Sequence, residues 1–149
     1  MAGYSNRSLV DKLGIKPGMR IAIINPPRGY RSSLGQLPPG VRVSARAQGP
    51  VPFIHFFTPN RALLREHLGD LLEALEPDGA LWISWPKKSS GVPTDMTEDA
   101  IREIALPMGL VDIKVAAIDD VWSGLKLVRR RANRRLQSRG PIAGNPVAL

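Results

Sequence analysis

Short runs of consecutive apolar residues recur along the chain, separated by stretches rich in proline, glycine and polar residues. The runs at 20–24 and 51–57 are apolar at nearly every position, which is typical of strands buried on both faces of a parallel sheet. Asn25-Pro26-Pro27 ends the first of them, because proline cannot donate a hydrogen bond to a sheet. Further strands are predicted at 41–45, 80–85, 111–118 and 125–129.

Between these runs, apolar residues recur at the spacing of an α-helix. A leucine stripe follows Asn60, the candidate N-cap, and Pro77-Asp78-Gly79 is expected to end that helix. The stripe consists of Leu63, Leu64, Leu68, Leu71, Leu72 and Leu75. Another helix is predicted from a cap at Asp95 or Thr97 as far as Pro107. A short helix that ends at Leu13, capped by Ser5 or Asn6, and a weak helical turn at 31–37 complete the prediction.

Strands that alternate with helices pair in parallel through right-handed crossovers. We therefore expect a three-layer, Rossmann-like α/β sandwich with a mostly parallel sheet. The last two strands are separated only by the loop 119–124, so they should form a C-terminal antiparallel hairpin at one edge. The length of 149 residues fits one domain, which we assign to 1–129. Residues 130–149 are expected to be a basic, disordered tail.

The net charge of +8 is concentrated in that tail. Six arginines follow Val128 with no acidic residue among them: Arg129, Arg130, Arg131, Arg134, Arg135 and Arg139. The rest of the chain is nearly neutral. The charge therefore points to the tail, and not to the folded domain, as a possible nucleic-acid contact.

Several functional classes are not indicated by the composition. No apolar run approaches the length of a bilayer span, and the first residues do not resemble a secretion signal. The chain has no cysteine, so a disulfide, a thiolate zinc site and a cysteine nucleophile are excluded. No Gly-x-Ser-x-Gly elbow or phosphate-binding P-loop is present, and no nucleophile can be named. We expect a cytoplasmic protein of bacterial type without a metal.

Two segments resemble parts of class I methyltransferases. "LGIKPGMRIAII" resembles the entry into the first strand of that fold, and "LLEALEPDGALWIS" is similar to its late helix-to-strand turn. Together, "LGIKPG", "LWISWPKKSSGVPTD", "MGLVDIKVAAID" and "WSGLKLVRR" look like a small bacterial family of unknown function, over about residues 3–131. The resemblance implies a shortened methyltransferase-like fold and no particular activity.

Two departures argue against S-adenosylmethionine as a cofactor. A methyltransferase needs glycines after the first strand so that bare backbone can approach the cofactor, whereas this chain has Pro26 and Pro27 there. The carboxylate that should hold the ribose after the second strand is also missing, and Ser44, Ala45 and Arg46 occupy that neighbourhood. We therefore expect no cofactor.

Polar residues follow each predicted parallel strand and should meet at the edge where those strands end, which is where open α/β sheets bind ligands. The predicted ligand-binding residues are Asn25, Arg28, Trp85, Lys87, Lys88, Ser89, Ser90, Asp119, Trp122 and Ser123, and Arg46, Thr58, Asn60 and Asp120 are expected nearby. Lysine charge and the amides of the following helix start suit a phosphate- or carboxylate-bearing ligand. The competing interpretation is that residues 87–91 are only a flexible, solvated loop.

The remaining candidates have structural interpretations that we favour. His55 lies in an apolar strand and is expected to be a hydrogen-bonded core residue, and His67 is expected to face solvent. Asp119 and Asp120 read as turn residues, with acid–base or cation-binding roles as the alternative. Trp85 and Trp122 should pack over strand ends, although both could stack on one base.

Two other functions stay open. Arg129, Arg130, Arg131, Arg134 and Arg135 could neutralise RNA phosphates, with a solubilising tail as the plainer interpretation. Alternatively, the chain is a degenerate methyltransferase-like domain that acts as a protein-interaction module. The principal prediction is a non-catalytic domain that binds an anion at the edge of its sheet.

Overall fold

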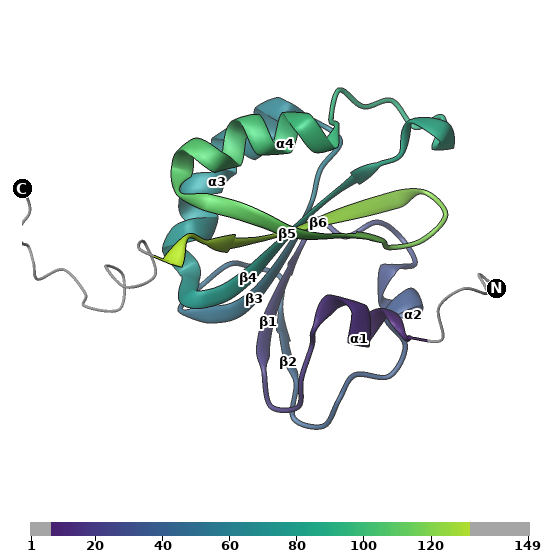
Figure 1. Ribbon diagram of the computed structural model, residues 1–149. Helices are drawn as coiled ribbons and strands as arrows, with labels where there is room; N and C mark the ends of the chain where they lie inside the picture. The colour runs from purple at the N-terminus through teal and green to yellow at the C-terminus, as the bar shows by residue number, and fades with distance from the viewer. Residues whose placement is uncertain (1–6, 132–149) are drawn as a thin grey trace, which may run out of the picture.

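The computed structural model describes residues 7–131, which form one six-stranded sheet with helices on both sides (Figure 1). The strand order is β2-β1-β3-β4-β6-β5. The strands are β1 (Arg20–Ile24), β2 (Arg42–Ser44), β3 (Val51–Phe57), β4 (Leu75–Pro86), β5 (Leu110–Ala117) and β6 (Trp122–Arg129). The helices are α1 (Leu9–Leu13), α2 (Tyr30–Leu34), α3 (Arg61–Ala74) and α4 (Glu98–Ala105), with 3-10 turns η1 (Lys88–Ser90) and η2 (Leu106–Met108).

The first four strands pair in parallel, and β6 runs antiparallel between β4 and β5. As a result β5 points in the same direction as β1 to β4, and only β6 is reversed. The predicted mostly parallel sheet with a C-terminal antiparallel hairpin is therefore confirmed. The prediction for the tail falls, apart from Arg130 and Arg131, outside the described residues, as do the expected caps Ser5 and Asn6.

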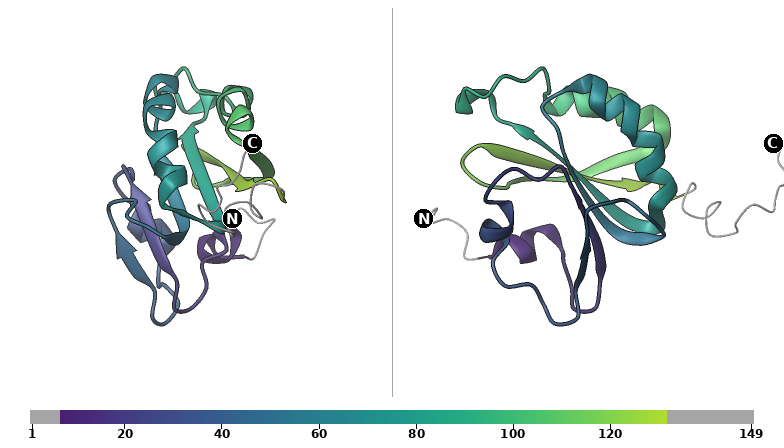
Figure 2. Two further views of the ribbon diagram at one scale, coloured as in Figure 1. Left: turned by 90° about the vertical axis from the view of Figure 1, so that its left-hand side faces the viewer. Right: turned by 180° about the vertical axis from the view of Figure 1, so that it is seen from behind.

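The sheet has two separate cores, one on each face. Figure 2 shows α3 and α4 covering one face and the much shorter α1 and α2 covering the other. The first core, which we call the α3–α4 side, receives Leu64, Leu68 and Leu71 of the predicted leucine stripe. The second, the α1–α2 side, is built around Tyr30 and Trp82. Because α1 and α2 have only five residues each, this second layer is thin.

The predicted elements are present, but several boundaries differ. Helix α3 ends at Ala74, and Pro77-Asp78-Gly79 lies inside β4 instead of ending the helix. The cause is tertiary: Leu75 pairs with Val51, and after an irregularity in register Ala80 pairs with Phe53. β6 likewise begins at Trp122 and not at Leu125.

The helix caps are partly as predicted. Thr97 caps α4, since its side chain accepts a hydrogen bond from the Ala100 amide at 3.0 Å. Asn60 occupies the N-cap position of α3 but makes no side-chain cap bond. The carboxylate of Asp95 accepts the Arg61 amide at 2.8 Å instead. At the start of α1, Ser8 is the cap.

A chain of three polar side chains crosses the α1–α2 side of the sheet. The Tyr30 hydroxyl lies 2.7 Å from His55 Nδ1, and the Ser84 hydroxyl lies 2.7 Å from His55 Nε2. His55 and Ser84 are completely buried, and the described residues contain no buried side-chain nitrogen or oxygen without a partner. Gly124 leaves room for this chain, because a Cβ there would lie 3.1 Å from the Ser84 hydroxyl. The prediction of His55 as a hydrogen-bonded core residue is confirmed.

Burial lowers the pKa of His55 from its ordinary 6.5 to about 3, so the imidazole is neutral at physiological pH. A neutral ring has one donor and one acceptor nitrogen, which matches its two hydroxyl partners. Burial also raises the pKa of Tyr30, so its hydroxyl stays protonated. This arrangement contributes most to stability when the histidine carries no charge.

We predict that the free energy of unfolding falls as the pH drops below 6.5, by up to about 1.4 kcal/mol per pH unit. Below that pH the unfolded chain binds a proton at His55 that the folded chain rejects, whereas above it neither state does. Urea titrations between about pH 6.5 and about pH 5, above most carboxylate pKa values, measure the slope. The slope should persist in His67→Gln and disappear in His55→Gln; an equal slope in both variants would contradict the assignment.

Candidate functional site

Strands β1, β3, β4 and β5 end at a common border of the sheet, which we call the C-terminal edge, and β6 begins there. It lies on the right of Figure 1, where the loop after β4 and the β5–β6 turn project side by side. The Lys87 amide donates to the Val121 carbonyl at 2.7 Å, which fastens this loop to the turn. The Asp95 amide and the Thr94 hydroxyl donate to the Pro59 carbonyl at 3.2 and 2.7 Å, which ties the loop to the end of β3.

The loop after β1 joins the same edge through a row of rings. Tyr30 packs edge-on against Phe57 with centroids 4.7 Å apart, and Phe57 packs against Trp122 at 5.4 Å. Asn25 adopts the left-handed conformation with φ of 57°, and both it and Arg28 are exposed. Trp122 thus lies on the α1–α2 side of the edge, and the predicted residues Asn25 and Arg28 lie in the loop between β1 and α2.

The lysine loop, residues 87–91, is partly closed on itself. The Ser90 hydroxyl donates to the Lys87 carbonyl at 2.6 Å and accepts the Val92 amide at 3.2 Å. The amides of Ser90 and Gly91 donate to the Lys87 and Lys88 carbonyls. These groups, expected to be ligand donors, instead hold the loop in shape. Lys87 is half-buried, whereas Lys88 and Ser89 are exposed, so these three side chains of the loop are accessible to a ligand.

The two tryptophans at this edge lie on opposite faces of the sheet. Trp85 is 7% exposed and belongs to the α3–α4 side, whereas Trp122 packs against the α1–α2 side. They therefore do not stack on one base, and Trp85 has the packing role that we favoured. Trp85 pairs in register with Ser123, which is half-buried.

The acidic residues of the β5–β6 turn act as turn residues. One carboxylate oxygen of Asp119 accepts the amides of Val121 and Trp122 at 2.8 and 2.7 Å. Asp120 is exposed. The interpretation of Asp119 as turn chemistry is confirmed.

The second histidine is only partly as expected. His67 is half-buried and its ring lies 5.8 Å from that of Phe56, so it is not simply solvated. Within residues 7–131 no group of three or more His, Asp or Glu side chains is placed to hold a metal ion. No helix in the same range is long and apolar enough to cross a membrane.

Arg129 belongs to the fold and not to the tail. It is 8% exposed, and its guanidinium donates to the carbonyls of Leu75 at 3.0 Å, Glu76 at 2.8 Å and Leu72. It thereby satisfies backbone acceptors at the end of α3 and the start of β4. The RNA contact expected of Arg129 stays a prediction, and its guanidinium donors are directed into the protein. Arg130 and Arg131 are exposed.

We predict that Arg129→Met lowers the free energy of unfolding by about 1.5–3 kcal/mol, because the variant loses charge-assisted hydrogen bonds to buried carbonyls. Arg130→Met removes the same charge from an exposed neighbour and should change it by less than about 0.5 kcal/mol. Urea denaturation of both variants checks this. Equal effects would mean that the guanidinium does not stabilise the helix end.

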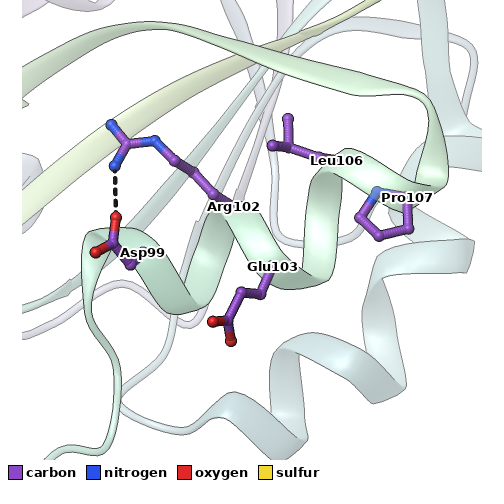
Figure 3. Close-up of a pocket in the computed structure, with 5 residues that line it drawn as sticks. All are labelled: Asp99, Arg102, Glu103, Leu106 and Pro107. Atoms are coloured by element: carbon purple, nitrogen blue, oxygen red, sulfur yellow. Dashed lines mark hydrogen bonds and ion pairs between the residues drawn. The ribbon is translucent and has the colours of Figure 1, made fainter.

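A charged cluster that the sequence interpretation missed lies on α4. Arg102 forms ion pairs with Glu98, with Asp99 at 2.9 Å and with Asp112 of β5 at 3.0 Å. It borders a cavity of about 400 Å³ lined by Asp99, Arg102, Glu103, Leu106 and Pro107 (Figure 3). The sequence contains a signal for this cluster, because Glu98 and Arg102 are four residues apart on a predicted helix, the spacing at which opposite charges form an ion pair. Since the guanidinium is shared among three carboxylates, the cluster fastens α4 to the sheet.

Comparisons with known proteins bear on the fold of the chain. No protein-family model matches the chain, and no curated protein is similar to it in sequence. Among solved structures, it is similar to a SAM-dependent methyltransferase from Aquifex aeolicus, with 15% identity and a TM-score of 0.57 over 80% of this chain and 86% of that one. It is also similar to a putative type 11 methyltransferase from Sulfolobus solfataricus, with 14% identity and a TM-score of 0.56 over 82% and 89%.

A third similar structure is the ribosomal protein L11 methylase from Lactobacillus delbrueckii subsp. bulgaricus, with 11% identity and a TM-score of 0.52 over 83% of this chain and 76% of that one. The chain has a class I methyltransferase-like fold. The resemblance noted in the sequence is confirmed for the fold. Sequence identities this low establish a shared fold and nothing more specific.

The residues at the edge do not fit the cofactor of that class. Pro26 and Pro27 have no amide hydrogen, and the Tyr30 amide is bonded to the Pro27 carbonyl at 3.1 Å, so the loop after β1 offers few donors. After β2, the Ser44 hydroxyl bonds to the backbone of Arg46. Residues 12–65 contain no Asp or Glu, so neither loop supplies a carboxylate for a ribose. We derive no methyl-transfer step.

Proposed function

We propose that this protein is a methyltransferase-like domain that binds an anionic, phosphate- or carboxylate-bearing ligand at the C-terminal edge of its sheet and does not transfer methyl groups. The observation that most directly supports this proposal is the hydrogen bond from the Lys87 amide to the Val121 carbonyl. It holds a loop with two adjacent lysines beside the β5–β6 turn. Arg28, Ser89, Trp122 and Ser123 complete the proposed contact set.

The charge balance at this edge supports the proposal. Within residues 7–131, the side chains of Arg28, Lys87 and Lys88 form no ion pair with a carboxylate. The nearby carboxylate of Asp119 is occupied by two backbone amides. The three cations have no internal ion-pair partner, so a bound anion gains their attraction without displacing one, against the charges of Asp119 and the exposed Asp120 in the neighbouring turn.

The misfit to the family cofactor supports the non-catalytic part. Two prolines replace the glycines where backbone should approach a nucleotide-like ligand, and the first two strands are followed by no acidic residue. RNA binding by the tail and a role as a protein-interaction module stay predictions, and the guanidinium of Arg129, one of the residues proposed for the former, is directed into the protein.

We predict that inorganic phosphate, nucleotides or sugar phosphates raise the melting temperature of the wild type, and that Lys87→Gln/Lys88→Gln loses most of that rise. The main chain of the loop is held by backbone bonds, so the variant should fold normally. Lys16→Gln/Arg42→Gln makes the same charge change at exposed positions near the opposite ends of the strands and should retain the response.

The same thermal-shift panel includes S-adenosylmethionine, for which no stabilisation is expected. Stabilisation by this cofactor alone would refute the proposal of a non-catalytic anion site. A response to phosphates that is identical in the wild type and the loop variant would locate the binding elsewhere.

A further inference from the structure

Basic and acidic residues are distributed unevenly along the described chain. Residues 7–60, which include α1, β1, α2 and β2, contain eight Arg or Lys residues and a single acidic residue, Asp11. Residues 61–112, which include α3 and α4, contain ten Asp or Glu residues and five Arg or Lys residues. The segment 7–60 is therefore basic, and the segment that contains the helices of the α3–α4 side is acidic.

On the α1–α2 side of the sheet, lysine residues gather where α1 meets β5 and β6. Lys114 and Lys126 lie directly opposite each other on these strands. The Lys114 ammonium donates to the Lys12 carbonyl at 3.0 Å, and the Lys126 ammonium lies 3.9 Å from the position that a Cβ on Gly14 would take. Two ammonium groups thus meet at the C-terminal end of α1, beside Lys12 itself. We call Lys12, Lys114 and Lys126 the lysine cluster.

This cluster is not neutralised from within. Burial lowers the pKa of Lys114, and the charges of Arg7, Lys126 and Lys12 lower it further. The carbonyls at the end of α1 offset part of this repulsion. Within residues 7–131, however, none of the three lysines forms an ion pair with a carboxylate.

A second pair of like charges lies on the opposite face of the sheet, at its far edge. Arg20 and Arg42 are paired directly across β1 and β2, and both are exposed. Like charges placed opposite each other in a sheet are destabilising. The pair formed by Lys114 and Lys126 has no carboxylate partner among the described residues, so it is suited to an external polyanion.

We propose that the lysine cluster binds the phosphodiester backbone of a nucleic acid. Its cations come from α1, β5 and β6, and Arg31 adds a further exposed cation on α2, on the same side of the sheet. Lysine and arginine without convergent base-reading groups provide binding that depends on salt and not on sequence. This inference is independent of the anion site at the C-terminal edge, because it uses different residues on the face of the sheet.

The test is fluorescence anisotropy of the full chain with a labelled single-stranded RNA of about 20 nucleotides, between about 50 and about 200 mM salt. Lys12→Gln/Lys126→Gln should weaken binding about tenfold or more at the lower salt concentration. It should also reduce the slope of log affinity against log salt by about 1.4, since each phosphate contact on a single strand contributes about 0.7. Lys126→Gln alone should reduce the slope by about half as much.

The matched control for Lys126→Gln is Arg65→Gln, which removes one charge from an exposed position on α3, on the other side of the sheet, and should leave the slope unchanged. The tail is present in every variant, so its arginines cannot produce the difference. Loss of RNA binding in Lys87→Gln/Lys88→Gln alone would overturn the inference and assign nucleic acid to the edge site. An unchanged slope in Lys12→Gln/Lys126→Gln would overturn it as well.

Two further measurements distinguish an RNA-binding surface from a structural role, a small-anion site and a membrane surface. Lys126→Gln should raise the melting temperature at low salt by about 1–3 °C, because it relieves repulsion; a lysine with a merely structural role would lower it. Inorganic phosphate at matched ionic strength should not displace the RNA, and full displacement would indicate a small-anion site instead. Binding to phosphatidylserine vesicles without binding to RNA would identify a membrane surface and contradict the inference.

Discussion

The structure depends on keeping one imidazole uncharged and doubly hydrogen-bonded at the centre of the sheet. His55 lies in the middle of β3, Ser84 lies on the neighbouring strand, and Tyr30 begins α2. A buried ring nitrogen without a partner is costly, so all three side chains must be in place together. This requirement fixes the loop after β1 relative to the two central strands, and the geometry of the C-terminal edge follows from it.

The order and type of the elements could be predicted because periodicity and chain-breaking residues act locally. The errors come from distant partners. Pro77-Asp78-Gly79 looks like the end of a helix, but pairing of Leu75 with Val51 draws those residues into β4. Asn60 looks like a cap, but the first amide of α3, that of Arg61, donates to the carboxylate of Asp95, which lies 34 residues after Arg61. Arg129 looks like the start of a basic tail until its carbonyl partners in another element are known.

The candidate site could be predicted in position but not in detail. Parallel strands end at one edge, so the convergence of their following loops could be expected from the order of the elements alone. Successive side chains of a strand point to alternate faces of the sheet, so an error of one residue in a strand boundary assigns every side chain to the wrong face. Trp122 lies inside β6, and its side chain is on the face opposite to that of Trp85. The use of the Ser90 hydroxyl within its own turn likewise depends on loop geometry that composition does not specify.

The lysine cluster on the α1–α2 side and the acidic residues of α3 and α4 on the other side give the molecule an electric dipole. Two copies with such dipoles attract most strongly when the lysine cluster of one meets the acidic helices of the other. A contact of this kind joins two different surfaces, so it repeats in the same sense with each added copy and leads to open rows instead of closed pairs. The attraction extends over only about 10 Å at 0.1 M salt, so any such rows belong to dilute buffers.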